Sequence, residues 1–271
     1  MQHFSGQKKL ICPPGEHRAG REIYRMENSV SSAALNAARE QLDAAEAARE
    51  VILLQHIANG VIIDSRTVQI APDVVIAPGA VILAGTILRG RTVIGAGCII
   101  GPNTLIEDSI VDEGSTVNAS QVYSSHIGPF THVRVNTVTD YGVHLGAYVE
   151  TKNSNFARGN TVSHLTYIGD SDVGKYCNFG CGTVTCNYDG KDKFRTQIGD
   201  YCFIGCNTNL VAPVKVGDGA YTAAGSTITK DVPAQALGIA RERQTNLDGW
   251  AEPKMEAYIA KKQKLENEQN K

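Results

Sequence analysis

Aliphatic residues recur along this chain at an interval of six. From Ile70 the interval holds over seven positions without a miss, and from Ile198 it holds over six. A third run, from Val143, is interrupted at three positions, Asn155, Thr161 and Tyr167. An interval of six fits neither the 3.6-residue period of an α-helix nor the alternation of a β-strand. The runs are Ile70, Ile76, Ile82, Leu88, Ile94, Ile100, Ile106; Val143, Val149, Asn155, Thr161, Tyr167, Val173, Phe179; and Ile198, Ile204, Leu210, Val216, Thr222, Ile228.

A prism-shaped parallel β-helix satisfies such a pattern. Each hexapeptide forms a short strand and a corner, and three of them complete one coil. Each aliphatic residue then points inward and stacks on its equivalent eighteen residues earlier, about 4.8 Å away along the axis. A small residue after it, such as Ala71 or Gly95, lets the chain turn. We therefore predict an all-β fold, a parallel β-helix of hexapeptide repeats.

Four segments follow from where the repeat holds and where it breaks. Residues 1–29 have no period and contain Pro13-Pro14-Gly15, so we expect an irregular arm. Residues 30–57 are rich in Ala, Glu, Arg and Leu and predict a helix, with Ser29 or Ser31 as its cap. The β-helix domain is expected over residues 58–232, with a loop insertion at 185–197 that contains an Asp-Gly turn. Residues 233–271 are expected to form a C-terminal arm and polar tail.

Composition narrows the possible partners and location. The formal net charge of -2 makes nucleic acid an unexpected partner. The chain has no apolar run of the roughly 18–20 residues that span a bilayer and no signal-peptide core, so we expect a cytoplasmic protein without membrane contact. Seven cysteines without a CxxC pair argue against a disulfide framework. Three of them follow a repeat residue at a corner, where we expect packing: Cys98, Cys177 and Cys202.

One histidine stands just upstream of the insertion, where a loop leaves the predicted scaffold. Loops on a rigid scaffold commonly carry function. A neutral imidazole is the usual general base near pH 7, and Glu150 lies fourteen residues before His164, close to one coil. Both a general base and an ordinary surface histidine at a corner fit this position.

The residues from Ser163 to Val232, which begin SHLTYIGDSDVGKYCNFGCGTVTCNYDGKDKFRTQIGD, closely resemble the acetyltransferase half of a bacterial family. This is the bifunctional N-acetylglucosamine-1-phosphate uridyltransferase/glucosamine-1-phosphate N-acetyltransferase family. The resemblance includes the segment ALGIAR at 236–241 and Gly249-Trp250, and extends weakly back to the helix, which resembles the family's linker. It implies a left-handed β-helix, acetyl-CoA as co-substrate, no metal for acetyl transfer, and a homotrimer with sites between subunits.

The resemblance also implies roles for individual residues. His164 becomes the general base for the amine of a phosphorylated amino sugar, supported by Glu150. The backbone N–H of Cys181 becomes the donor to the thioester carbonyl or oxyanion. Sugar-phosphate contacts are implied for Arg134, Lys152, Tyr167, Asn178 and Lys193, and acetyl-CoA contacts for Cys181, Asn187, Tyr188, Cys206, Ala224 and Arg241.

The sequence departs from the family's pattern at several places. Cys181 and Cys206 stand where the family more often has Ala and Ser, which suggests sensitivity to oxidation or alkylation. Val135-Asn136 replaces a Pro-Gly-like turn after Arg134, which bears on the placement of that arginine. Residues 1–57 contain no Gly-rich nucleotide-binding motif, so we expect acetylation without uridyltransferase activity.

Three alternatives stay open. A hexapeptide acyltransferase acting on another amino sugar or a nucleotide sugar would keep His164 and change the sugar contacts. A zinc site between subunits would use His126, His132 and His144, although broken phase between Ile127 and Val143 argues against clean stacking. A non-catalytic partner of a separate uridyltransferase would need none of this chemistry.

Overall fold

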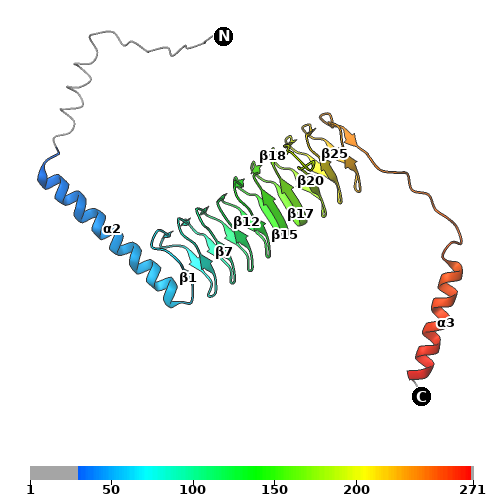
Figure 1. Ribbon diagram of the computed structural model, residues 1–271, viewed down its shortest axis with the longest axis horizontal. Coiled ribbons are helices and arrows are strands. Elements are labelled where there is room, and N and C mark those ends of the chain that lie inside the picture. Colours follow the sequence, from blue (N-terminus) through cyan, green and yellow to red (C-terminus); the bar gives the residue numbers. More distant parts are fainter. Residues whose placement is uncertain (1–29, 270–271) are drawn as a thin grey trace, which may run out of the picture.

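A parallel β-solenoid of about ten turns forms the body of the molecule (Figure 1). The structure is a computed structural model that describes residues 30–269. Helix α2 (Ser32–Ala58) leads into the first coil, and helix α3 (Glu252–Gln269) lies beyond the last one. The predicted fold class, a left-handed parallel β-helix, is confirmed.

Each coil contributes a strand to each of three faces, which the chain visits in the order 1, 2, 3. Face 1 contains β1 (Ile62–Ile63), β4 (Val81–Ile82), β7 (Ile99–Ile100), β10 (Thr116–Val117), β13 (His132–Val133), β20 (Val184–Cys186), β23 (Asn209–Val211) and β26 (Thr227–Ile228). Face 2 contains β2 (Gln69–Ile70), β5 (Ile87–Arg89), β8 (Leu105–Glu107), β11 (Gln121–Tyr123), β14 (Val138–Thr139), β16 (Asn155–Phe156), β18 (Ser171–Val173), β21 (Thr196–Ile198) and β24 (Val214–Val216).

Face 3 contains β3 (Val75–Ile76), β6 (Val93–Ile94), β9 (Ile110–Val111), β12 (His126–Ile127), β19 (Asn178–Phe179), β22 (Phe203–Ile204), β25 (Tyr221–Thr222) and β27 (Leu237–Gly238). Two long strands, β15 (His144–Lys152) and β17 (Thr161–Gly169), begin on face 3 and end on face 1. They therefore run continuously around the edge between these faces, which we call corner 3–1. The edge between faces 1 and 2 is corner 1–2.

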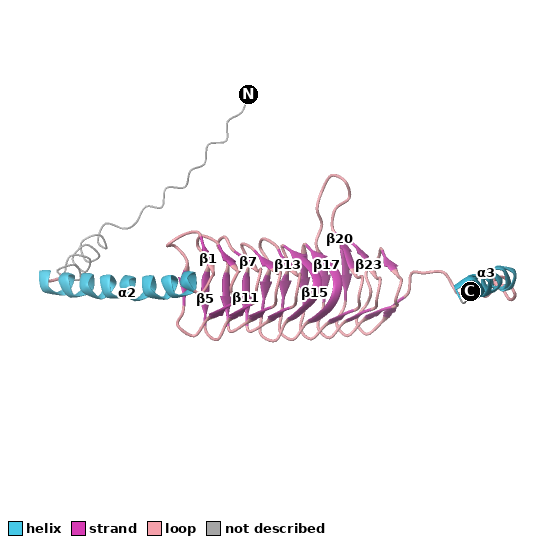
Figure 2. Cartoon of the chain, turned by 90° about the horizontal axis from the view of Figure 1, so that it is seen from below, coloured by secondary structure: helices cyan, strands magenta, loops and turns pink. Residues whose placement is uncertain are grey.

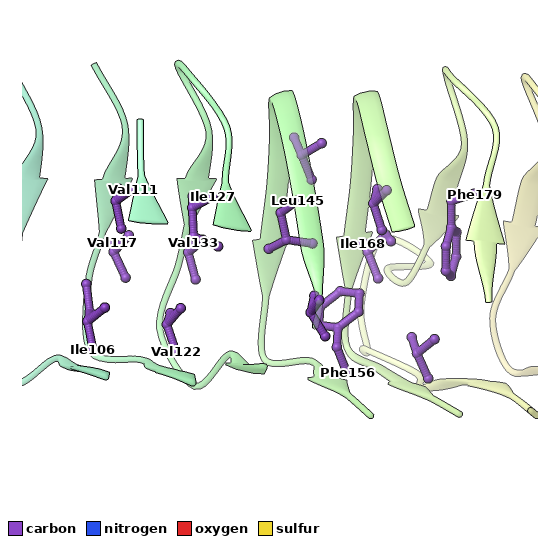
Figure 3. Packing of buried hydrophobic residues seen from close by; sticks show 14 of the residues in the cluster. Ile106, Val111, Val117, Val122, Ile127, Val133, Leu145, Phe156, Ile168 and Phe179 are labelled. Carbon is purple, nitrogen blue, oxygen red and sulfur yellow. The ribbon is translucent and has the colours of Figure 1, made fainter. Parts of the chain in front are cut away.

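The inward column of side chains confirms the repeat at both ends of the solenoid. Every residue of the run from Ile70 to Ile106 is buried, and so is every residue of the run from Ile198 to Ile228. Figure 3 shows how inward side chains stack along the interior of the middle coils, from Ile106 to Phe179. Burial of one aliphatic side chain per strand, worth about 1.5–3 kcal/mol each relative to exposure, supplies the main favourable free energy of a fold with little other interior.

The middle coils are shorter than the predicted eighteen residues. Leu105 registers with Gln121, a spacing of 16 residues, because two of the three strand–corner units have five residues instead of six. The predicted third run is therefore out of phase in its middle: Asn155 is exposed and Tyr167 is half-buried, while the next residue after each points inward. A uniform six-residue spacing was the wrong expectation for these coils.

The N-terminal helix is attached to the first coil by a few side chains. Of the two serines predicted as its cap, Ser31 takes the role, since its Oγ accepts from the Ala34 N–H at 3.2 Å. Leu53 is the buried residue of α2, and Glu50 pairs with Arg66 of the first coil at 3.0 Å. The irregular arm predicted for residues 1–29 lies outside the described residues.

The C-terminal segment contains more regular structure than predicted. Strand β27 extends the solenoid past residue 232, and α3 lies within the predicted polar tail. Helix α3 was not predicted because its apolar residues do not gather on one face, and all its described side chains are exposed. Within residues 30–269, no helix combines the length and the apolarity needed to cross a membrane.

The three corner cysteines pack as predicted. Cys98, Cys177 and Cys202 are buried, with at most 2% of their surface exposed. Each thiol lies 3.0 or 3.1 Å from a backbone carbonyl oxygen of the next coil and donates to it. All six cysteines that the structure describes are free thiols.

Candidate functional site

The insertion is a short hairpin that leaves the solenoid at corner 1–2, between β20 and β21 (Figure 2). Tyr188 and Lys193 form an antiparallel bridge across it, and Asp189 closes its tip by accepting from the N–H groups of residues 191 and 192. Arg195 fixes its base, donating from Nε and Nη2 to the two carboxylate oxygens of Asp172 at 2.9 and 2.6 Å. This fork-on-carboxylate geometry holds the hairpin in one orientation.

Three cationic side chains gather at corner 1–2. Arg134 follows β13, Lys152 ends β15, and Lys193 comes from the insertion. The neighbouring Lys193 ammonium lowers the pKa of Lys152 below its ordinary value, first through a direct side-chain contact and then through charge repulsion, and the Arg134 guanidinium adds to the effect. Cations held this close repel one another, so the corner is prepared to bind a polyvalent anion.

The carboxylate of Glu150 lies on face 1 beside this cluster. Its Oε1 accepts from Arg134 Nη1 at 2.5 Å. In the register of face 1, Glu150 stands between His132 of the preceding coil and Tyr167 of the next. His164 registers instead with Ala147, at corner 3–1. The partner that the structure gives Glu150 is therefore Arg134.

Tyr167 lies flat along face 1 because the residue two positions later is glycine. A Cβ added to Gly169 would stand 2.2 Å from the Tyr167 hydroxyl oxygen. The hydroxyl lies 3.5 Å from Asn187 Nδ2, which also donates to the carboxylate of Asp170. Asp170 in turn accepts from Asn153 Nδ2 at 2.5 Å. The phenol hydroxyl is thereby directed toward corner 1–2, where the cations lie.

Four of the predicted residues form a column along corner 3–1. His164, Cys181, Cys206 and Ala224 each precede a turn residue. The N–H of each later turn residue donates to a carbonyl of the preceding coil at 2.8–2.9 Å: Gly182 to Leu165, Asn207 to Cys181 and Gly225 to Cys206. His164 and Cys206 are exposed, and Cys181 is half-buried. Arg241 reaches the top of the column, since its Cδ lies 3.7 Å from the Cβ position of Gly225. The column and the cation cluster flank face 1 on opposite edges.

Two predicted residues lie away from face 1 in this single chain. Asn178 is exposed on face 3, in register with Thr161 and Phe203. Tyr188 is exposed on the insertion, where its hydroxyl donates to the carbonyl of Gly190 at 2.6 Å. In one chain, the other predicted residues lie on face 1 or along its two edges, whereas Asn178 and Tyr188 do not.

Sequence reasoning missed Gly169 and Asp170. Asp170 is buried and has a positive φ of 49° at corner 1–2, where it joins the insertion to the preceding coil through Asn153 and Asn187. The signal was present as Ile168-Gly169-Asp170: a glycine beside an inward aliphatic residue, followed by a side chain that tolerates the left-handed region.

The histidines of the zinc alternative do not converge. His126 and His144 are in register on face 3, with ring centroids 5.0 Å apart and the ring planes tilted by 52°, so the register is restored across the predicted phase break. His126 Nε2 lies 2.7 Å from an Asp112 carboxylate oxygen. His132 lies on face 1 instead, in register with Glu150. In the described part of the chain, no group of three potential ligands is placed to hold a metal ion.

Comparison with known proteins agrees with this architecture. Residues 73–108 and 195–230 match the family model for the bacterial transferase hexapeptide (six repeats). The chain contains a hexapeptide-repeat transferase domain. A bifunctional protein GlmU from Clostridium beijerinckii is 46% identical over 227 residues, which is 81% of this chain and 50% of that protein. Another, from Caldicellulosiruptor saccharolyticus, is 55% identical over 132 residues, 49% of this chain and 28% of that protein.

The alignment lies in the C-terminal half of these relatives, and the chain spans half of their length or less. Among solved structures, the polysialic-acid-specific acetyltransferase NeuO is similar with 16% identity and a TM-score of 0.36, over 73% of this chain and 99% of that one. The acetyltransferase domain of PglB from Neisseria gonorrhoeae has 16% identity and a TM-score of 0.19, over 74% of this chain and 66% of that one.

Proposed function

We propose that this chain transfers the acetyl group of acetyl-CoA to the amine of glucosamine-1-phosphate. The observation that carries the proposal is the arrangement of face 1. Three cations stand at one edge, the column of His164, Cys181 and Cys206 stands at the other, and Tyr167 lies between them. The aligned relatives, which are named bifunctional protein GlmU, support the same class of enzyme.

The phosphate of the acceptor binds at corner 1–2 in this proposal. A sugar phosphate carries up to two negative charges, and the fork of Arg134 binds one pair of oxygens while Lys152 and Lys193 act as point charges. An anion there relieves the repulsion that lowers the pKa of Lys152. The hydroxyl of Tyr167, directed to the same corner, contacts the sugar ring.

The amine then faces corner 3–1. His164 accepts a proton from the nitrogen as the nitrogen attacks the thioester carbon, and the carbon–sulfur bond breaks as the tetrahedral intermediate collapses to release CoA. The N–H of Cys181 stabilises the oxyanion. Across residues 30–269, no backbone or side-chain acceptor is found for this N–H, whereas the N–H groups of Gly180 and Gly182 on either side are both bonded. Within the same range, the N–H groups of residues 206 and 224 are also free at this corner, so the assignment of Cys181 rests on its place next to His164 in the column.

The CoA arm follows the column upward past Cys206 and Ala224 toward Arg241. Asn178 and Tyr188 lie off face 1, and this supports a site that a neighbouring copy of the chain completes, as expected for the proposed homotrimer. The side-chain amide of Asn187 donates to Asp170 and Tyr167, which lie on the acceptor side of the site. Asn187 therefore fits a role in positioning the acceptor site as well as the proposed contact with CoA. Cytoplasmic location and the absence of uridyltransferase activity stay predictions.

An acceptor panel tests the proposal. CoA release is measured with glucosamine-1-phosphate, glucosamine-6-phosphate, free glucosamine and a nucleotide-linked amino sugar at equal concentrations. We expect the highest kcat/KM with glucosamine-1-phosphate, whose phosphate would bind the cations of corner 1–2 while its amine faces His164. Preference for the nucleotide-linked amine would select the alternative acyltransferase, and no CoA release with any acceptor would select the non-catalytic alternative.

A further inference from the structure

Cys181 and Cys206 occupy equivalent corner positions on neighbouring coils. Phe179 registers with Ile204, and the Asn207 N–H donates to the Cys181 carbonyl at 2.8 Å, so residues 181 and 206 stack across the coil boundary. Neighbouring parallel strands lie about 4.8 Å apart. That spacing falls within the roughly 4.4–6.8 Å between Cα atoms that a disulfide spans.

The side chain of Cys206 leans toward the lower coil. The Cβ position of Gly180, the residue next to Cys181, lies 2.4 Å from the Cys206 backbone N and 2.8 Å from its Sγ. The absence of a side chain at 180 therefore leaves room for both the backbone and the thiol of Cys206. Cys206 is exposed and Cys181 is half-buried, so a small reagent in solution reaches this pair.

A second pair of cysteines in the same two coils provides an internal contrast. Cys177 and Cys202 stand next to the registered residues Asn178 and Phe203, but only 1% and 2% of their surfaces are exposed. The hydrogen bond with Cys202 and burial raise the pKa of the Cys177 thiol. Thiol–disulfide exchange requires an accessible thiolate, so this buried pair is protected.

We propose that Cys181 and Cys206 form a dithiol site that low-molecular-weight disulfides convert into an intramolecular disulfide. The thiolate of Cys206, the more exposed residue, attacks the small disulfide, forms a mixed disulfide and releases one small thiol. The thiolate of Cys181 then attacks the Cys206 sulfur and releases the second small thiol. Overall, two protein thiols are oxidised and one small disulfide is reduced to two small thiols, and the two protons pass to the released thiols.

The consequence for acetyl transfer rests on the proposed function. The pair lies in the middle of the column where the thioester and the CoA arm bind, beside the proposed oxyanion donor. A disulfide there replaces two separate side chains by one fixed bridge that narrows the path of the acyl donor. Oxidised protein is therefore expected to lose acetyl transfer, and a dithiol reductant is expected to restore it.

The test exposes the full-length protein to oxidised glutathione and follows intact mass, with peptide mapping of any link. Wild type is expected to lose the mass of two hydrogen atoms, with Cys181 linked to Cys206 and with Cys177 and Cys202 unmodified. The Cys181→Ala variant, which keeps the exposed thiol without its partner, is expected to retain glutathione as a stable mixed disulfide. Circular dichroism of both proteins checks that the solenoid is intact.

The outcomes test the dithiol site and the proposed function independently of each other. Three results with the wild type would overturn the dithiol site. The protein could accumulate the mixed disulfide as Cys181→Ala does, it could link other cysteines, or it could fail to react. If the expected link forms but the reduced protein releases no CoA with any acceptor, the dithiol site stands and the proposed function falls. If the link forms and acetyl transfer continues at the full rate, the placement of the acyl donor at this corner is wrong.

Discussion

Replacing Gly169 by alanine tests whether the flat position of Tyr167 serves acceptor binding. The new Cβ would stand 2.2 Å from the Tyr167 hydroxyl oxygen and 2.6 Å from Cζ, whereas ordinary contact begins at 3.4 Å. The hydroxyl must therefore move by roughly 1.2 Å, and a misplacement of about 1 Å in a positioning group can lower the rate by about a hundredfold.

The structure also predicts that this change leaves the fold intact. The clashing atoms belong to the far end of a side chain that can rotate, and Gly169 has no positive φ to lose. We expect kcat/KM for glucosamine-1-phosphate to fall about ten- to a hundredfold, up to ~2.7 kcal/mol in transition-state free energy. The free energy of unfolding is expected to change by less than about 1.5 kcal/mol.

A double-mutant cycle provides the control. In a Tyr167→Ala background the phenol is absent, so Gly169→Ala is expected to have no further effect on kcat/KM. Steady-state CoA release supplies kcat/KM, and urea unfolding supplies stability. If Gly169→Ala keeps the wild-type kcat/KM, or lowers it equally in both backgrounds, the argument that Gly169 positions Tyr167 is refuted.

Three further predictions follow from the same region. Lys193→Ala is expected to raise KM for the phosphorylated acceptor about tenfold, ~1.4 kcal/mol, while Lys191→Ala on the same hairpin leaves it unchanged; equal effects would remove the phosphate role. Arg195→Ala frees the base of the insertion from Asp172, so hydrogen exchange in residues 187–194 is expected to quicken, and unchanged exchange would show that the fork is dispensable. Burial lowers the pKa of His144 below 6.5, so the unfolded chain binds more protons than the folded one, and Tm is expected to fall as the pH drops from about 7.5 to about 5.5. His144→Gln should make Tm depend less on pH. An unchanged slope of Tm against pH would show that another group causes the dependence.

The predictable part of the fold is the part governed by burial alone. One aliphatic residue in six predicted the solenoid, because an inward side chain on each strand is the only way this chain removes such residues from water. The five-residue units around Gln121 were not predictable by counting in sixes, since the shorter corners leave the inward residues aliphatic while shifting the phase. Helix α3 escaped prediction for the opposite reason, because it buries nothing.

The candidate site shows the same division. Spacing brought His164 and Glu150 within one coil of each other, but Glu150 accepts a hydrogen bond from Arg134, and the register places His164 at a different edge. The stacking of Cys181 on Cys206 was hidden by the insertion, which separates them by 25 residues although they lie one coil apart. Only the resemblance connected the cations of corner 1–2 with His164, because no periodicity relates residues on opposite edges of face 1.

The central claim is that His164 removes the proton from the acceptor amine, and one rate measurement tests it most directly. CoA release is followed at saturating acetyl-CoA and glucosamine-1-phosphate for wild type, for His164→Ala and for His144→Ala, which removes the neighbouring imidazole on face 3. We predict that kcat falls about 10²- to 10⁴-fold in His164→Ala and stays within a few-fold of wild type in His144→Ala. Wild-type turnover by the His164→Ala protein would contradict the claim.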